Sequence, residues 1–507
     1  MSEKADAGTS LAVLVILQAM VSAASLVVEI VAGRMLAPYL GMSLYTWTSV
    51  IAVVLAGFSA GHWVGGLIAA RDTGSALRLT AWSMAGAAIT TASAVLLLRL
   101  VSGPVISGVA HPVGAIVVLT SLVFFLPSFF AGIPAPVLSH VAVSGQPDRS
   151  GPALGAMFAA GALGAIFGTL AAGFVFISWL GSVRTLSVVA GIYVLVAAGL
   201  FALSRPGSIR GFAALVVAMV ATGAISAGTT GLSDPCTRES QYFCIRILDA
   251  SAEARAPARV MVLDHLGHGI SVEGEPGRLV TAHAALLDSL ARLRMNGKPF
   301  SSYFIGGGSY TIPRAWSAEA DVVSMTVAEI DPVVTELAIS RMWFDPGATR
   351  IVHEDARMLL AREENRYDVI IGDAFTDIAV PAHLVTREFF EIVRSRLRDD
   401  GVYLMNVVDH FERLRALSAL TRTLREVFPV VEIWAERQRP QGDERAIFVV
   451  LAGSSQTRTD IIDGPEPDRH KFGRLPQVAV DTLIARIASP VLTDDYAPID
   501  RLMGRLD

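Results

Sequence analysis

The chain has 507 residues, of which 52% are apolar and only 17% charged, and its mean hydropathy is +0.52. These values exclude a purely water-soluble protein and leave room for two domains. The net charge of −5, with no basic run or tail, argues against a protein that binds nucleic acid by neutralising phosphates. Charge is also unevenly divided, because residues 1–203 hold 12 of the 87 Asp, Glu, Lys and Arg side chains. A bilayer core excludes charge and a soluble surface requires it, so this step predicts a domain boundary near residue 230.

The first part of the chain contains apolar runs of about 20 residues, the length that spans a bilayer. Seven such runs are expected, at residues 11–33, 47–70, 79–98, 113–133, 152–177, 183–203 and 211–231. The N-terminus MSEKADAGTS leads into the first run without a cleavage pattern, so we expect a retained membrane helix and not a signal peptide. We therefore predict a transmembrane helical domain over residues 1–232 that has the lipid bilayer as a partner.

Small and ionisable residues stand out within these runs. Small residues recur every four positions around Gly164 and Gly168, a spacing that predicts close packing of helix backbones. Glu29 lies inside the first run, where a carboxylate is costly unless it faces a partner or a cavity. A structural contact, for example with Arg34, and a role in transport are equally compatible with this position.

The loops give conflicting signals about orientation. Arginines gather after the second, fourth and sixth runs, at Arg71, Arg78, Arg149, Arg205 and Arg210. The alternate loops carry only Arg34 and Arg184, so the positive-inside rule places the N-terminus in the cytoplasm and, with seven spans, the soluble part outside. Cys236 and Cys244 are the only two cysteines. They either form a disulfide in an oxidising compartment or remain two buried thiols.

From about residue 236 the pattern changes to short β-rich runs. YFCIRIL, RVMVLD and GISVEG predict a small antiparallel unit over residues 233–275. After the helical stretch LVTAHAALLDSLARL, apolar strands alternate with amphipathic helices. This alternation predicts a Rossmann-like α/β domain of the class I methyltransferase type over residues 276–507, with a mostly parallel sheet covered by helices on both faces.

Ligands of such sheets bind at the carboxyl ends of the strands, so polar residues there are informative. Gly306, Gly307 and Gly308 end the first predicted strand, where missing side chains let a nucleoside or amino-acid group lie against the backbone at a helix start. Glu329 and Asp331 end the second strand, and an acidic residue there can accept hydrogen bonds from both ribose hydroxyls.

The third and fourth predicted strands also end in acids. Asp355 precedes Ala356, an arrangement in which the carboxylate can accept from an adenine amino group while the small neighbour leaves room for the ring. Asp373 ends the fourth strand, over the crevice. Considered alone, each acid is better explained as a helix N-cap or a solvated loop residue than as a ligand contact. Their register at consecutive strand ends favours one shared nucleotide site.

These residues resemble the spermidine synthase (polyamine aminopropyltransferase) family, in particular its membrane-fused members. The similarity runs from about Glu239 to Asp495. It rests on ESQY at 239–242, LD at 263–264, IGGG at 305–308, EID at 329–331, EDA at 354–356, and DAFTD at 373–377 followed by VPAHL.

The resemblance implies that Glu329 holds the ribose, that Asp355 holds the adenine amino group, and that Asp373 is the catalytic carboxylate. It implies S-adenosylmethionine or its decarboxylated form as donor, small-molecule substrates and no metal. The absence of a Cys/His cluster with ligand spacing agrees with the last point. Further substrate contacts are expected from side chains that flank this site: Tyr242, Asp264, His268 and Asp377.

The chain departs from the family pattern where amines bind. Ser309 stands where the family usually has an aspartate that grips the donor's ammonium group, and Phe243 and His268 stand in place of glutamines. The tyrosine and glutamate that help to bind the acceptor align with His283 and Ala285. Because a buried ammonium without a counter-charge is costly, the nucleoside half of the site is kept and the amine half is not.

Three hypotheses follow. The first is an aminopropyltransferase-like enzyme that releases methylthioadenosine. The second is cleavage or cyclisation of S-adenosylmethionine without an external acceptor, or methyl transfer, which the lost amine contacts favour. The third is a membrane transporter or lipid-linked component with a ligand-sensing domain.

The donor is made in the cytosol, so we expect a multi-pass protein of the cell (inner) membrane whose catalytic domain lies on the cytoplasmic side. The sequence leaves open whether the protein forms a homo-oligomer.

Overall fold

The chain folds into two units, Met1–Cys244 and Ile245–Asp507, in the computed structural model. The structure describes residues 10–109, 111–204, 209–231, 235–374, 380–437, 445–464 and 466–503. The division falls later than the boundary expected after residue 232. The reason is that the segment from 235 to 244 forms hydrogen bonds with the helices of the first unit.

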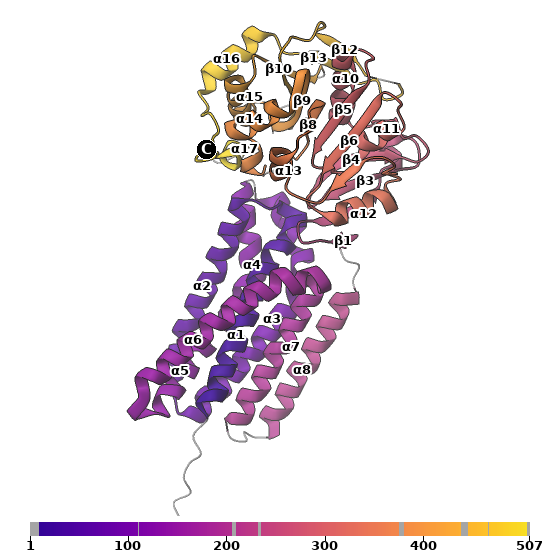
Figure 1. Ribbon diagram of the computed structural model, residues 1–507. Helices are drawn as coiled ribbons and strands as arrows, with labels where there is room; N and C mark the ends of the chain where they lie inside the picture. Colours follow the sequence, from indigo (N-terminus) through magenta and orange to yellow (C-terminus); the bar gives the residue numbers. More distant parts are fainter. Residues whose placement is uncertain are drawn as a thin grey trace, which may run out of the picture. The chain divides into compact units, whose positions relative to one another are not determined.

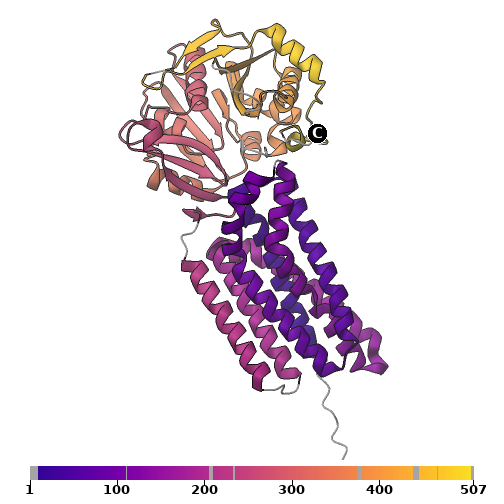
Figure 2. The same ribbon diagram turned by 180° about the vertical axis from the view of Figure 1, so that it is seen from behind.

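The first unit is a bundle of helices that lie side by side (Figures 1 and 2). Its elements are α1 (Leu11–Leu40), α2 (Leu44–Ala69), α3 (Thr73–Gly108), α4 (Pro112–Gly132), α5 (Pro134–Ser144), η1 (Pro147–Arg149), α6 (Ser150–Ala171), the π-helical turn η2 (Ala172–Phe176), α7 (Ile177–Leu203), α8 (Ile209–Gly231) and the short strand β1 (Arg238–Glu239).

Five helical stretches within the described residues are long and apolar enough to cross a membrane: Leu11–Leu40, Leu44–Ala69, Thr73–Gly108, Val113–Ser144 and Pro147–Leu203. The last stretch contains Gly181 in a non-helical conformation (φ 74°, ψ 169°), which breaks it within α7. A shorter apolar helix covers Val216–Thr229. The seven predicted runs fall on α1, α2, α3, α4, α6, α7 and α8. The number of membrane crossings stays a prediction.

Close helix packing around Gly164 and Gly168 is confirmed. A Cβ atom at Gly164 would lie 2.3 Å from the carbonyl oxygen of Ala19, and one at Gly168 would lie 2.2 Å from that of Ala23. Real Cβ atoms do not approach so closely, so only glycine allows α6 to pack against α1 at this distance.

Of the alternatives left open for Glu29, the contact with Arg34 is not formed. Arg34 donates instead to the backbone carbonyl of Ser240, with 2.8 Å between Nη2 and the oxygen. The structure joins Cys236 and Cys244 in a disulfide, the first of the two alternatives left open.

The second unit begins with a small antiparallel sheet of β2 (Cys244–Asp249), β3 (Ala258–Leu263) and β4 (Leu266–Val272), with the short helix α9 (Ser251–Ala254) between β2 and β3. Ile245 pairs with Leu263, and Ala258 pairs with Val272. The predicted β-rich unit ahead of the larger domain is thus confirmed.

A nine-stranded sheet follows, in the order β12-β13-β10-β11-β9-β8-β5-β6-β7. Its strands are β5 (Phe300–Ile305), β6 (Val322–Ala328), β7 (Arg350–Val352), β8 (Tyr367–Gly372), β9 (Leu397–His410), β10 (Val430–Glu436), β11 (Arg445–Gly453), β12 (Ile461–Asp463) and β13 (Lys471–Arg474). The helices are α10 (Ala282–Met295), α11 (Thr311–Ser317), α12 (Pro332–Arg341), α13 (Ala356–Arg362), η3 (Ala382–Leu384), α14 (Arg387–Arg396), α15 (Arg415–Val427), α16 (Gln477–Ile487) and α17 (Ile499–Met503).

The sheet is mixed and not mostly parallel as expected. Strands β7, β6, β5, β8 and β9 are parallel, whereas β11 pairs antiparallel with both β9 and β10. The reason is the short connection from β10 to β11, because a parallel pair needs a crossover of a dozen or more residues. Helices flank the sheet in Figures 1 and 2. Tyr303 and Ile305 belong to a core with α13–α17, whereas Phe304 packs on Trp316 of α11, as strand alternation requires.

Candidate active site

The loop after β5 is a tight glycine turn. Gly306 has a φ angle of 87°, which favours glycine, and a Cβ atom there would lie 3.2 Å from the carbonyl oxygen of Asp373. A Cβ atom at Gly307 would lie 2.4 Å from the ring of Tyr310. The turn therefore depends on glycine, and it brings the ends of β5 and β8 together.

Glu329 fastens this turn to the end of β6. It is 5% exposed; its Oε2 accepts from the Gly307 N–H at 2.7 Å and its Oε1 from the Asp331 N–H at 2.9 Å. Burial raises the pKa of Glu329 to about 7, although the backbone hydrogen bonds oppose this shift. The carboxyl group therefore changes charge near neutral pH. The backbone N–H of Gly308 also bonds to this carboxyl group, which leaves lone-pair capacity for a hydroxyl donor, and the ribose role stays a prediction.

Two of the predicted acids act as helix N-caps. The Asp331 Oδ1 accepts from the Val333 N–H at 2.9 Å, and the Asp355 Oδ1 accepts from the Met358 N–H at 2.9 Å. The second oxygen of Asp355 lies 2.7 Å from Nε2 of His383, a neighbour that we did not predict. The caps account for the local structure at both positions, and the adenine role of Asp355 stays a prediction.

Asp373 lies directly after β8. Its backbone N–H donates to the Ile305 carbonyl at 3.2 Å, which sets the carboxyl group at the end of β5. The Asp373 Oδ1 accepts from Nδ2 of Asn406 on β9 at 3.0 Å. Asn406 is buried, and its Oδ1 has no partner within the described residues. We did not predict Asn406, although a lone polar residue in the apolar run YLMNVV was a usable signal.

His268 on β4 lies against the glycine turn, because a Cβ atom at Gly308 would be 3.8 Å from its Nδ1. Burial lowers the pKa of His268 to about 4, while the charge of Asp373 acts in the opposite direction. The imidazole is therefore neutral at pH 7. Its Nε2 is buried without a hydrogen-bond partner in the part of the chain that the structure describes. A neutral, unpartnered ring nitrogen beside a carboxylate is suited to contact a polar ligand.

The residues after the glycines carry no charge. The Ser309 hydroxyl bonds to that of Thr311 at 2.5 Å and to the carbonyl oxygen of His268 at 3.3 Å. Tyr310 is fully buried, its hydroxyl lies 2.6 Å from that of Thr335, and its ring stacks on Phe344. Both hydroxyls are engaged within the protein, and neither side chain is a carboxylate that could pair with an ammonium group.

The remaining residues that we predicted to contact a ligand are found at the following positions. Asp264 is buried at the turn between β3 and β4, and its carbonyl accepts from Arg246. Ala356 is buried in the first turn of α13. Tyr242 belongs to the first unit and is 39% exposed. Asp377 lies outside the described residues.

The structure thus brings together Gly306–Gly308, Glu329, Asp373 and His268. No group of three or more His, Cys, Asp or Glu side chains among the described residues could hold a metal ion.

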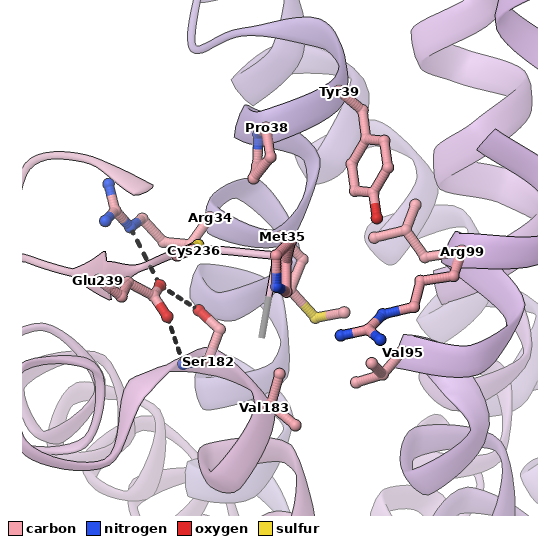
Figure 3. A pocket seen from close by; sticks show the side chains of 12 residues that line it. Arg34, Met35, Pro38, Tyr39, Val95, Arg99, Ser182, Val183, Cys236 and Glu239 are labelled. Atoms are coloured by element: carbon pink, nitrogen blue, oxygen red, sulfur yellow. Dashed lines mark hydrogen bonds and ion pairs between the residues drawn. The ribbon is translucent and has the colours of Figure 1, made fainter. Parts of the chain in front are cut away.

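A separate pocket lies in the first unit, between α1, α3, α7 and the segment that contains β1 (Figure 3). Glu239 accepts from the backbone N–H and the hydroxyl of Ser182, at 2.8 and 2.5 Å, directly after the break at Gly181. Its Oε1 lies 3.8 Å from Nε of Arg34. These groups hold the disulfide-closed segment against the helices, so we assign them a structural role.

If β5 is numbered 1, the seven strands β5–β11 lie side by side in the sheet in the order 3-2-1-4-5-7-6. The glycine turn follows strand 1, which is the point where this order reverses. In open α/β sheets this is where ligands bind. The order, the glycine turn and the acids at the strand ends define a class I methyltransferase-type α/β domain.

Residues 304–450 match the family "Spermine/spermidine synthase domain". A polyamine aminopropyltransferase of Vibrio vulnificus is 34% identical over 144 residues, which cover 28% of this chain and 47% of the relative. An N-terminal histidine N-methyltransferase of Emericella nidulans is 31% identical over 170 residues, 32% of this chain and 30% of the relative. A probable spermidine synthase from Corynebacterium glutamicum has a crystal structure that aligns with a TM-score of 0.42 at 21% identity, covering 50% of this chain and 95% of that one.

The second unit therefore carries a spermine/spermidine synthase domain. The chain spans about half the length, or less, of the curated relatives named above.

Proposed function

We propose that the second unit is a transferase of the polyamine aminopropyltransferase type, with S-adenosylmethionine or its decarboxylated form as donor. The observation that carries this proposal is the position of Asp373 beside the glycine turn, within a domain that matches the spermine/spermidine synthase family. The relatives supply the reaction class, and the acids at the strand ends supply groups for an adenosyl moiety.

The chemistry requires one new bond and one broken bond. The lone pair of an amine nitrogen attacks the carbon next to the sulfonium, the carbon–sulfur bond breaks, and methylthioadenosine leaves with the electron pair. The nitrogen loses a proton, which the Asp373 carboxylate accepts. Asn406 holds the Asp373 Oδ1 through its Nδ2–H and leaves the other oxygen for the amine. Because a sulfonium is a good leaving group, positioning and charge complementarity supply much of the rate.

The amine side of the site supports a second candidate, in which S-adenosylmethionine is cleaved or cyclised without an acceptor or donates its methyl group. The observation that favours it is the uncharged surface formed by Ser309, Tyr310 and neutral His268. A buried ammonium group would have no counter-charge from these side chains. The methyltransferase relative agrees with methyl transfer as one form of this candidate.

The products separate the candidates. Purified full-length protein is incubated with S-adenosylmethionine or its decarboxylated form, with and without putrescine, and the products are analysed by mass spectrometry. Methylthioadenosine together with spermidine is the result expected for the first candidate. Methylthioadenosine with a lactone or cyclic amino acid, or S-adenosylhomocysteine, would reject it and support the second.

The side of the membrane is a separate question. The disulfide between Cys236 and Cys244 is typical of oxidising compartments, and the positive-inside rule applied to the arginines also favours an outside position for the soluble part. Both features oppose the cytoplasmic placement that the donor suggests. Labelling of the cysteines in intact cells by a membrane-impermeant maleimide, before and after an added reductant, decides between the two sides.

A further inference from the structure

A pocket of the second unit lies at the amino-terminal ends of the parallel strands, whereas the candidate active site lies at their carboxyl ends. The first residues of all five parallel strands contribute to its lining: Arg398 of β9, Tyr367 of β8, Ser301 of β5, Val322–Thr326 of β6 and Arg350 of β7. Its volume, about 340 Å³, is within the range of sites that hold small molecules. The proposed transfer reaction makes no use of this pocket.

The pocket exists because β7 is short. β7 pairs with Thr326–Ala328 of β6, so the preceding residues Val322–Met325 have no neighbouring strand on that side in the described part of the chain. This edge of β6 stays open, since Val323 is 70% exposed and Ser324 is exposed as well. The gap covers four residues of β6, which is shorter than a typical strand. It therefore suits a small ligand better than an added peptide strand.

The charges around the pocket are mainly positive. Arg350, Arg366 and Arg398 line it, and no carboxylate among the described residues does. Nη1 of Arg350 donates to Glu363 at 2.6 Å, and Nη1 of Arg398 lies 3.5 Å from a carboxylate oxygen of Asp368. Arg366 is exposed and forms no hydrogen bond or ion pair with the residues that the structure describes. These two acids offset two of the three charges, so a net positive charge remains at Arg366.

The pocket also offers hydrogen-bond donors that the protein does not use. The side chains of Ser324, Thr349 and Asn365 line it and form no hydrogen bond with the described residues. The guanidinium of Arg366 adds several N–H donors and no acceptor. Free donors and a positive charge require a ligand with negatively charged acceptors. Phosphate and carboxylate groups meet this requirement, because they can accept two parallel hydrogen bonds from one arginine.

We propose that this pocket binds a small organic anion, which carries a phosphate or carboxylate group next to an apolar part. Arg366 is the main contact of the charged group, because the guanidinium groups of Arg350 and Arg398 already lie beside acids. Trp316 and Val323, which also line the pocket, provide apolar surface for the rest of the ligand. The proposal is independent of the transfer reaction, which is assigned to the opposite ends of the strands.

The test uses phenyl phosphate and benzoate, which join an anionic group to an apolar ring. Full-length protein in phosphatidylcholine nanodiscs is titrated with each anion by isothermal calorimetry. At least one of them should bind, and their relative affinities distinguish a phosphate ligand from a carboxylate ligand. Benzyl alcohol, a neutral molecule of similar size, should not bind. Binding should be the same in Asp373→Asn, because this change lies at the other end of the strands, so the result does not depend on the proposed function.

Arg366→Gln separates this pocket from other cationic surfaces, and it removes an exposed side chain on which no described residue depends. The dissociation constant of the bound anion should rise about ten-fold, the effect of a lost hydrogen bond to a charged group. Arg486→Gln, near the end of α16, also replaces an exposed arginine and should leave this constant unchanged.

Four results would each overturn the proposal. They are a lack of binding by both anions, equal binding of benzyl alcohol, an unchanged dissociation constant in Arg366→Gln, and tighter binding of a hexaglutamate peptide. The last result would identify the open edge of β6 as a site for an acidic peptide partner and not for a small anion.

Discussion

The two units use the same residue types, glycine and buried acids, for different purposes. In the helical unit, Gly164 and Gly168 remove side chains so that two helices touch through their backbones. In the α/β unit, Gly306 lets the chain turn with a positive φ angle next to Asp373. The first arrangement creates packing, and the second creates a site lined by backbone groups.

Buried acids differ between the units in a similar way. Glu239 holds a segment in place, because it accepts from Ser182 and lies beside Arg34. Glu329 accepts only backbone N–H groups and has a raised pKa, so its charge responds to conditions near neutral pH. The two buried acids therefore differ in their partners, and Glu329 has no cation beside it among the described residues to offset the rise in pKa that burial causes.

The largest expected effect concerns Asp373. Asp373→Asn removes the proton acceptor and should lower kcat by about 10²–10⁴-fold, the usual contribution of a general base. Donor binding, measured by calorimetry, should be unchanged. Asp399→Asn at the exposed start of the neighbouring strand β9 is the matched control and should keep full activity. An unaltered kcat for Asp373→Asn would end the assignment.

The next effect concerns Glu329 and pH. Since burial raises the pKa of Glu329 from 4.5 to about 7, its protonated form is favoured in the folded state. Glu329 therefore contributes its full share to the free energy of unfolding below about pH 4.5. This contribution, about 3 kcal/mol, is lost as the pH rises through 7. Glu329→Gln should abolish this dependence. Denaturant unfolding at pH 5 and pH 8 measures it, and an identical pH dependence in the variant would show that Glu329 is not its source.

The disulfide is expected to have a smaller effect. Cys236 and Cys244 are eight residues apart, and replacing both by serine should cost about 2–3 kcal/mol by the chain-entropy argument. The loss should appear as a lower unfolding temperature of the helical unit. A reductant should lower that temperature in the unaltered protein and have no effect on the double variant.

The smallest effect tests the packing role of glycine. Gly164→Val should destabilise the bundle by about 1–3 kcal/mol, because its side chain meets the Ala19 carbonyl. Gly155→Val on the same helix is the matched control, since a Cβ atom there meets nothing within 4 Å. Equal unfolding temperatures for the two variants in detergent would show that α1 and α6 do not depend on this contact.

Much of the fold could be predicted from the sequence, because local patterns carry the information. Apolar runs of bilayer length predicted the long helices, and alternating strands and helices predicted the α/β unit. The glycine turn and the acids at the strand ends were also found, since the carboxyl ends of parallel strands meet at one edge of a sheet. These features depend on neighbouring residues in the chain.

Tertiary structure alone decided the contacts between residues far apart in the sequence. It paired Asn406 with Asp373, placed His268 beside the glycine turn, and gave Arg34 to the segment around Ser240 instead of to Glu29. It also inserted β11 antiparallel between β9 and β10. The physical reason is that such contacts depend on how the chain returns on itself, and hydrophobic periodicity carries no information about that.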